Sequence, residues 1–305
     1  MRSAALRSIG IAVLAVGAGL VAWAFLGGGP ASQNQVLAEL AELAELPPPS
    51  PSAEDNFPAV VDSAVRAPGS RVTPMGAVFE IVDTIPHDVG AFTQGLEIHD
   101  GRLFESTGLI GRSTIRELHL DTGAVLRNLA VSDVFAEGLT IVGDSAVQLT
   151  WRAGVAYRYD LDTFQRTDTY TYDGQGWGLC NAGDELIMSN GTPTLSIRDP
   201  ETFALRSTVD VTFSGTPIDD LNELECVNGT VWANVWKSSL IIEIDPITGH
   251  VLTVLNARSL TPPDLLDSSS AVLNGIAYDP SDDTFLLTGK LWPTIYKVRI
   301  TPVDQ

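Results

Sequence analysis

The sequence predicts an all-β fold, a five-bladed β-propeller, and three observations point to it. Beyond Met75 the chain consists of short β-type runs separated by turn residues, without a long amphipathic helix. A hairpin-like segment recurs five times along this part of the chain. Of the 305 residues, 44% are hydrophobic and only 18% are charged, so the chain can bury a large core.

The first element in chain order is a leader. Arg2 and Arg7 precede an uncharged apolar run over residues 9–26. A positive start followed by such a run is typical of an export signal, and the run is also long enough to span a bilayer. We expect residues 1–26 to be a signal peptide or a membrane anchor, with residues 9–26 as the membrane tether in the second case. Both interpretations place the rest of the chain in the periplasm or outside the cell.

A tether is expected next, over residues 27–75. It contains a glycine run, the repeat LAELAELAEL over Leu37–Leu46, and a proline-rich stretch that begins at Pro47. The repeat is rich in helix formers, but the prolines cannot continue a helix and favour an extended spacer. A partner-binding helix is the alternative. Residues 76–305 then form the propeller, which we interpret as a catalytic domain.

Five repeats make up that domain. Each starts with a Gly-Leu-like pair and continues with an apolar run, a turn and a second apolar run. The anchor residues are 43, 40, 45 and 52 positions apart: Leu96, Leu139, Leu179, Leu224 and Ile276. A second strand–turn–strand motif recurs between them, so each repeat holds about four strands, which is typical of a β-propeller. A β-sandwich with accidental similarity is the alternative.

The last repeat offers only three strands and ends with residues 294–300. An unpaired strand over residues 77–85 precedes the first repeat. We expect these two segments to pair and close the ring, because closure removes exposed sheet edges.

Polar and aromatic residues occupy equivalent positions in the repeats. If the first strand is innermost, residues two before each anchor and residues ending each second strand meet at one end of the channel. The first set is Gln94, Glu137, Trp177, Asn222 and Asn274. The second set is Glu105 to Thr107, Trp151, Asn190, Trp236 and Lys290. Polar groups around an apolar-walled mouth indicate a binding site.

The chemistry open to these groups is general acid and base catalysis. Glu137 among aromatic rings would be shifted toward its protonated form. Lys290 could stabilise an oxyanion or simply pair with Glu137. The Asn222 amide could donate a hydrogen bond to the same oxyanion. The tryptophans could line the site or pack between blades. No nucleophile with an activating base appears, which disfavours covalent catalysis.

Charge and composition exclude other classes. A net charge of -20 argues against a nucleic-acid partner. The four histidines lack metal-ligand spacing, so we expect no metal and no cofactor. Cys180 and Cys226 could form one bridge or remain two buried thiols. We expect a monomer.

Eight motifs stand in unbroken order between Val78 and Ile300. They are FTQGL, FAEGLT, QLTW, GWGL, LNELE, WANVW, LNGIAYD and TGKLWP. With these motifs the chain resembles the plant and bacterial type of glutaminyl-peptide cyclotransferase. The resemblance implies a five-bladed propeller that converts the N-terminal glutamine of peptides or proteins into pyroglutamate and releases ammonia, without zinc.

The resemblance also carries over site residues. As catalytic groups it implies Glu137, Asn222 and Lys290. As substrate-binding groups it implies Phe92, Gln94, Phe135, Trp151, Trp177 and Trp236.

Two other functions are open at this point. GIAYDP over residues 275–280 also occurs in calcium-binding propellers, which would suit a metal-dependent lactonase or esterase. Its oxygen ligands would be Glu137, Asn190, Asn222 and Asn274. The second alternative is a non-catalytic exported propeller that binds cell-wall or peptide ligands.

Overall fold

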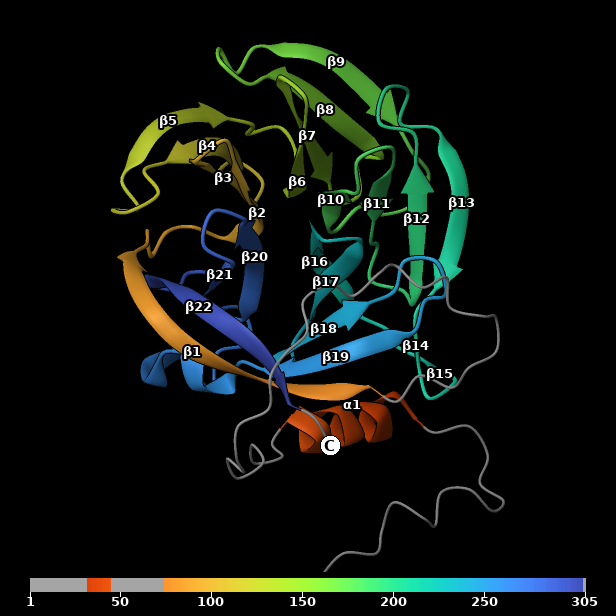
Figure 1. Cartoon of the computed structure of the whole chain (residues 1–305). Coiled ribbons are helices and arrows are strands. Elements are labelled where there is room, and N and C mark those ends of the chain that lie inside the picture. The colour runs from red at the N-terminus through yellow and green to blue at the C-terminus, as the bar shows by residue number, and fades with distance from the viewer. Residues whose placement is uncertain (1–31, 45–73, 304–305) are drawn as a thin grey trace, which may run out of the picture.

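The computed structural model describes residues 32–44 and 74–303. Within these residues the chain forms one α-helix, 22 strands and two short 3-10 helices. The strand order divides into five four-stranded units, here called blades 1 to 5, which surround a central axis (Figure 1). The prediction of an all-β propeller is therefore confirmed.

The blades follow one another along the chain. Blade 1 holds β2 (Thr93–His99), β3 (Arg102–Thr107), β4 (Thr114–Leu118) and β5 (Val125–Ala130). Blade 2 holds β6 (Ala136–Val142), β7 (Ser145–Thr150), β8 (Val155–Asp160) and β9 (Arg166–Thr171). Blade 3 holds β10 (Leu179–Asn181), β11 (Leu186–Met188), β12 (Thr194–Arg198) and β13 (Leu205–Asp210).

Blade 4 holds β16 (Leu221–Val227), β17 (Thr230–Val235), β18 (Leu240–Ile244) and β19 (Val251–Asn256). Blade 5 holds β20 (Leu273–Asp279), β21 (Thr284–Gly289), β22 (Thr294–Val303) and β1 (Met75–Pro86). The small hairpin of β14 (Thr212–Phe213) and β15 (Thr216–Pro217) connects blades 3 and 4. The helices η1 (Arg258–Leu260) and η2 (Pro263–Leu265) connect blades 4 and 5.

The first strand of each blade lies innermost, which is the condition under which the polar residues of the repeats were expected to meet. These strands, β2, β6, β10, β16 and β20, each contact the first strands of both neighbouring blades. The apolar core lies between the blades, in five clusters of buried side chains. Each predicted anchor residue is at most 1% exposed and belongs to a different cluster. The repeat spacing in the sequence is therefore the spacing of the blade interfaces.

Strand β1 closes the ring. It pairs antiparallel with β22 from Gly76 to Pro86, so the predicted pairing of residues 77–85 with residues 294–300 is confirmed. The start of β1 also pairs in parallel with β19 of blade 4, which joins blades 4 and 5 into one eight-stranded sheet. The N-terminal strand thus covers the outer edges of two blades.

Helix α1 (Gln33–Ala44) packs against the outside of this seam (Figure 1). Val36 and Leu40 are four residues apart and lie on one helix face, where they are 1% and 0% exposed in the cluster between blades 3 and 4. The Gln33 amide exchanges two hydrogen bonds with the backbone of Asp219, at 3.2 and 3.4 Å. This part of the expected tether is therefore docked on the propeller.

The leader, residues 1–26, and most of the expected tether lie outside the described residues. Among the described residues, no helix has the length and hydrophobicity that crossing a membrane requires. The predicted domain boundaries stay predictions.

A disulfide joins Cys180 on β10 to Cys226 on β16, with a Cα–Cα distance of 5.4 Å. The two alternatives that the sequence left open are thereby resolved. The bridge spans 46 residues. Closing a loop of this length stabilises the fold by about 4 kcal/mol in the chain-entropy estimate. It fixes the inner strands of blades 3 and 4 to each other.

Candidate active site

Irregular strand pairing presents polar side chains at one end of the inner strands. In blades 1, 2, 4 and 5, the register between the first and second strands shifts just before the anchor residue. The residues within these irregular stretches include Gln94, Glu137, Asn222 and Asn274. A bulge releases a residue from the ladder and redirects its side chain. The same irregularity, used four times, presents polar groups from distant parts of the chain at equivalent positions around the hub.

The next residue along each inner strand closes the hub. It is glycine in four blades, and in two of these blades a larger residue would clash with a neighbouring backbone. A Cβ on Gly138 would lie 2.6 Å from the carbonyl oxygen of Trp177, and one on Gly178 would lie 2.0 Å from that of Asn222. Only glycine permits backbones to approach this closely.

Blade 4 carries Glu223 at this position instead. Its carboxylate accepts backbone N–H bonds from Leu96 at 3.3 Å and from Ile276 at 2.8 Å, and so connects three blades across the hub. Burial raises its pKa well above the usual range. The hub is therefore filled at this level, and we interpret it as the floor of the site.

Five aromatic rings form the walls. The Phe92 and Phe135 centroids are 6.1 Å apart, and those of Phe135 and Trp151 are 5.5 Å apart. Trp177 and Trp236 pack edge to face at 5.3 Å. All five rings are half-buried. Their remaining exposure suits the wall of a pocket, whereas rings that pack between blades are expected to be covered.

Gln175 links two of these rings. Its Oε1 accepts a hydrogen bond from Trp151 Nε1 at 2.6 Å and another from Trp177 Nε1 at 3.2 Å. One amide oxygen thereby fixes the orientation of indoles from blades 2 and 3. Sequence reasoning missed this residue, although its place in GQGWGL, two residues before Trp177, could have drawn attention to it.

Glu137 and Lys290 form the ionisable centre of the site. They are 5% exposed each and interact electrostatically. Burial raises the pKa of Glu137 to about 8, an effect that the charge of Lys290 only partly offsets. Burial lowers the pKa of Lys290 to about 8, again partly offset by Glu137. Lys290 Nζ also lies 5.0 Å from the Phe92 ring centroid. The structure thus brings these two residues together, as the sequence predicted.

No hydrogen bond from the described residues lowers the pKa of the Glu137 carboxyl group. Nothing in that part of the chain compensates its buried charge except Lys290. Two groups with pKa values this close to each other exchange a proton at little free-energy cost near neutral pH.

Three amide side chains complete the site. Asn274 Nδ2 donates to the carbonyl oxygen of Thr93 at 3.0 Å and to Gln94 Oε1 at 3.3 Å, which holds the Gln94 amide in place. Asn222 is 2% exposed, and its Oδ1 has no hydrogen-bond partner among the described residues. A buried acceptor without a partner can accept a hydrogen bond from a ligand.

Comparisons with known proteins identify the family. Residues 58–300 match the sequence profile described as glutamine cyclotransferase. The chain belongs to the glutamine cyclotransferase family. A glutaminyl-peptide cyclotransferase from Arabidopsis thaliana is 39% identical over 228 aligned positions, and the match covers 72% of this chain and 71% of the relative. The crystal structure of Myxococcus xanthus glutaminyl cyclase is 41% identical, with a TM-score of 0.72, over 76% of this chain and 100% of that one.

Three other predicted positions do not belong to the centre of this glutamine cyclotransferase site. The Asn190 Oδ1 accepts hydrogen bonds from Thr192 N at 3.1 Å and Thr192 Oγ1 at 2.6 Å, so it is engaged in a turn rather than free to bind calcium. The Thr107 hydroxyl bonds to that of Thr114 at 2.6 Å. Glu105 is 0% exposed and pairs with His87 and Arg116, whose hydrogen bonds and charges lower its pKa, so it does not suit a general acid. Among the described residues, no three histidine, cysteine, aspartate or glutamate side chains are grouped to hold a metal ion.

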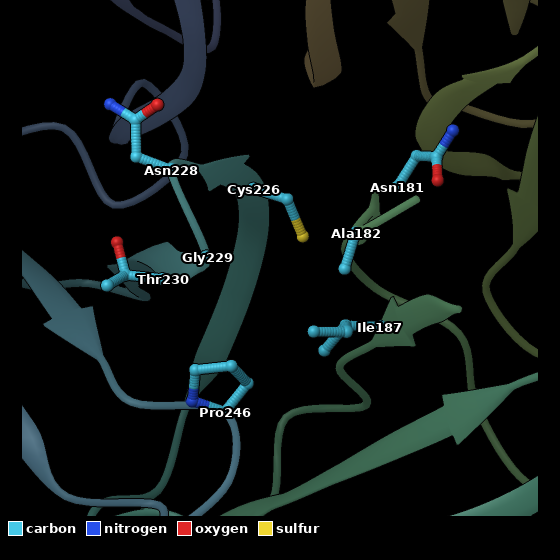
Figure 2. Close-up of a pocket in the computed structure, with 8 residues that line it drawn as sticks. All are labelled: Asn181, Ala182, Ile187, Cys226, Asn228, Gly229, Thr230 and Pro246. Carbon is cyan, nitrogen blue, oxygen red and sulfur yellow. The ribbon is translucent and has the colours of Figure 1, made fainter. Parts of the chain in front are cut away.

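A separate small pocket lies at the opposite ends of the inner strands, between blades 3 and 4 (Figure 2). Its lining residues come from the hairpin turns there and from the strand beside the disulfide: Asn181, Ala182, Ile187, Cys226, Asn228, Gly229, Thr230 and Pro246. None of the predicted site residues lines it. The candidate active site is therefore distinct from this pocket.

Proposed function

We propose that this chain is a glutaminyl-peptide cyclotransferase, which converts the N-terminal glutamine of peptides or proteins into pyroglutamate and releases ammonia. One observation carries the proposal beyond family membership. Glu137 and Lys290 are both buried and interact electrostatically, Lys290 lies against the half-buried Phe92 ring, and both pKa values lie at about 8. An N-terminal α-amine also titrates near 8, so proton transfer among the three groups is close to isoenergetic.

Binding supplies the geometry of the reaction. In water the flexible glutamine seldom folds its α-amine back onto the γ-carbonyl. In the proposed complex Trp151, Trp177 and Trp236 hold the aliphatic part of the side chain, and Gln94 orients the α-amine. A pocket that holds this near-attack shape lowers the barrier by several kcal/mol, on the order of the known effects of proximity. The peptide beyond the first residue leaves through the mouth, so recognition of later residues is loose.

Glu137 moves the proton. The α-nitrogen attacks the side-chain carbonyl carbon, and a C–N bond forms as the carbonyl oxygen becomes an oxyanion. Glu137 accepts the proton that the α-nitrogen releases and passes it to the side-chain nitrogen. The bond from the carbonyl carbon to this nitrogen then breaks, ammonia leaves, and the ring remains. Each turnover returns Glu137 to its starting protonation state.

Lys290 and Asn222 stabilise the oxyanion. An ammonium group and an amide donor in a site largely closed to water act more strongly on developing charge than they would in bulk water. The Phe92 ring, whose centroid lies 5.0 Å from Lys290 Nζ, keeps water from this side of the ammonium group, which adds to the effect of its charge. The substrate is an uncharged side chain, so the stabilisation grows mainly as the reaction proceeds.

Incubation of the purified chain with a Gln-initiated dipeptide, with ammonia measured over time, tests the proposal. Expected are ammonia and pyroglutamyl product in equal amounts from the wild type, and a loss of at least about a hundredfold in Glu137→Gln. A matched peptide that begins with asparagine should release none at a comparable rate, since its ring would be smaller. Absence of ammonia from the Gln peptide, with the protein folded, would refute the function.

We also propose that the chain is exported. The N-terminal sequence supports this, because positive residues precede an apolar run. The disulfide supports it independently, since such bonds persist in oxidising compartments. Cell fractionation of a tagged chain tests it, and recovery of the protein only in the reducing cytoplasm would contradict it. Recovery in the membrane fraction would favour an uncut anchor over residues 9–26.

A further inference from the structure

A second buried ionic cluster lies at the junction of blades 5 and 1, where His87, Glu105 and Arg116 meet. His87 Nε2 is 3.0 Å from Glu105 Oε1, and Arg116 Nε is 3.0 Å from Glu105 Oε2. Thr93 Oγ1 donates to Glu105 Oε1 at 2.7 Å, and Arg116 also pairs with Asp88 at 2.9 Å. The cluster has no role in the chemistry proposed above.

The contacts of His87 define its protonation state. Its Nδ1 lies 2.9 Å from the carbonyl oxygen of Trp292, a group that can only accept a hydrogen bond. Its Nε2 faces a carboxylate whose own pKa is lowered, since the hydrogen bond from His87 and the charges of His87 and Arg116 outweigh burial. Nδ1 also lies 3.4 Å from the Thr288 hydroxyl, but that hydroxyl donates its own proton to the carbonyl oxygen of Thr294 at 2.9 Å, so it too can only accept from the ring. Both ring nitrogens therefore face acceptors, and both carry a proton. His87 is an imidazolium.

This imidazolium fastens a loop that carries a site residue. Besides its bond to Trp292, the His87 backbone N–H donates to the carbonyl oxygen of Pro293 at 2.9 Å. Trp292 and Pro293 follow Lys290 in the turn between β21 and β22. On the other side, Leu291 N donates to the carbonyl oxygen of Ala91 at 2.6 Å, next to Phe92. The ammonium of Lys290 and the ring that it contacts are thus held from both sides.

Glu105 ties the same cluster to the other half of the site. It bonds to Thr93, which directly precedes Gln94, and the Thr93 carbonyl accepts the Asn274 amide that holds Gln94. Hydrogen bonds therefore run from the Lys290 turn through His87 and Glu105 to the strand that carries Gln94.

We propose that His87 is a positioning residue for Lys290: its imidazolium, anchored on Glu105, fixes the Trp292–Pro293 turn so that Lys290 stays buried against Phe92. The role in catalysis rests on the proposed function. The role in holding Lys290 does not, because it concerns the free protein.

Lysine titration by NMR tests the placement directly. The chain contains only three lysines, Lys237, Lys290 and Lys297, so lysine labelled with ¹³C at Cε gives three signals, and Lys290→Met assigns the one of interest. In the wild type we expect the Lys290 midpoint at about 8. In His87→Gln and in Glu105→Gln the turn loosens, water reaches the ammonium, and the midpoint should rise by about one unit or more.

Glu117→Gln is the matched control. Glu117 lies on β4 of the same blade and, like Glu105, is bonded by two basic side chains, here Arg102 and Arg127. Its side-chain hydrogen bonds within the described residues involve no residue of the Lys290 turn. The same loss of charge there should leave the Lys290 midpoint unchanged. A shift in all three variants would show that His87 and Glu105 act only through general stability, and would overturn the proposal. An unchanged midpoint in folded His87→Gln and Glu105→Gln would overturn it as well.

A measurement on the unaltered protein covers the case in which both variants fail to fold. The ¹⁵N shifts of the His87 ring should report two protonated nitrogens at pH 7. A neutral imidazole at that pH would overturn the proposal, because a neutral ring can donate to only one of its two acceptors.

Activity adds a separate readout. With a Gln dipeptide, His87→Gln should lower kcat about tenfold or more and move the alkaline limb of the pH profile upward, along with the Lys290 midpoint. Loss of structure alone would lower the active fraction without moving the limb. If the wild type releases no ammonia while the midpoint shifts as expected, the proposed function fails and the positioning role stands.

Discussion

Two buried glutamates, in neighbouring blades, show opposite electrostatic behaviour. Glu137 is 5% exposed, no hydrogen bond from the described residues lowers its pKa, and burial raises that pKa to about 8. Glu105 is 0% exposed, yet its pKa is lowered, because His87, Arg116 and Thr93 outweigh burial. Burial alone therefore does not set the protonation state. The donors around the carboxylate do.

The difference separates a reactive group from a structural one. A carboxylate surrounded by charged donors is held in one state and cannot readily take up a proton. A carboxylate without donors, beside one ammonium group, can exchange a proton near neutral pH, which acid–base catalysis requires. Leaving a buried charge so poorly compensated costs stability, and functional sites are where such costs persist.

The largest expected effect comes from exchanging the two carboxylates for amides. Glu137→Gln should lower kcat by at least about a hundredfold with little loss of thermal stability, since it removes an acid–base group that makes few contacts. Glu105→Gln should lower the midpoint of thermal unfolding, because it leaves His87 and Arg116 without their buried partner. Ammonia release and thermal denaturation of both variants check this contrast. Equal loss of activity and stability in the two would contradict it.

The pH dependence should follow the Glu137–Lys290 centre. As pH falls below about 8, Glu137 gains a proton and the base is lost, because its pKa is raised. As pH rises above about 8, Lys290 loses its charge, because its pKa is lowered. The oxyanion then has no cation to stabilise it. We expect a bell-shaped profile of kcat/KM with its maximum near 8 and at least about a tenfold decrease at pH 6. A flat profile between pH 5 and 7 would assign Glu137 an ordinary pKa.

A smaller effect is expected at Gln175, whose side-chain hydrogen bonds within the described residues go to two indole rings and not to the ionisable pair. Gln175→Met removes the acceptor for both indole N–H groups and should lower kcat/KM about tenfold, mainly through KM, because the rings bind the substrate. Gln175→Glu retains the acceptor oxygens and is the control, which should keep most of the activity. Steady-state kinetics and tryptophan emission check the pair. An equal loss of kcat/KM in both variants would show that the hydrogen bonds to the two indoles do not account for the effect.

The smallest effect on activity should follow loss of the disulfide. In Cys180→Ser with Cys226→Ser the free energy of unfolding should fall by about 4 kcal/mol, since the cross-link no longer restricts the unfolded chain. Activity at 25 °C should change by less than about twofold, because the bridge lies beyond the closed hub from the site. Denaturant unfolding and the ammonia assay check both values. A tenfold loss of activity with unchanged stability would assign the bridge a direct role at the site.

Much of the fold could be predicted from local sequence patterns. The anchors Leu96 and Ile276, for example, lie where repeat spacing puts them, because every blade must bury the same face on its neighbour. The closing strand was predictable for the same reason, since the last repeat lacked a partner. The docking of helix α1 was not, because helix propensity does not say which surface a short amphipathic helix will meet.

The site could be predicted from the sequence where the repeat pattern fixes the direction in which a side chain points. It could not be predicted where contacts between loops determine a residue's role. Glu137 lies two residues before an anchor and Lys290 follows a second strand; these two repeat positions meet at the same end of the channel, so their convergence follows from the topology. Gln175 and His87 lie in connecting loops, and their roles depend on which carbonyl or ring happens to be adjacent after folding. Glu223 marks the single blade in which glycine is replaced at the hub, a departure visible in the sequence whose purpose appears only in three dimensions.

Titration of the Glu137 carboxyl group measures the central claim most directly. Glutamate labelled with ¹³C at Cδ, with Glu137→Gln and Glu105→Gln for assignment, reports both carboxyl groups in one sample. We predict a Glu137 midpoint near 8 and a Glu105 midpoint below the usual range for glutamate. A Glu137 midpoint between 4 and 5, the range of an exposed glutamate, would contradict the proposed acid–base centre.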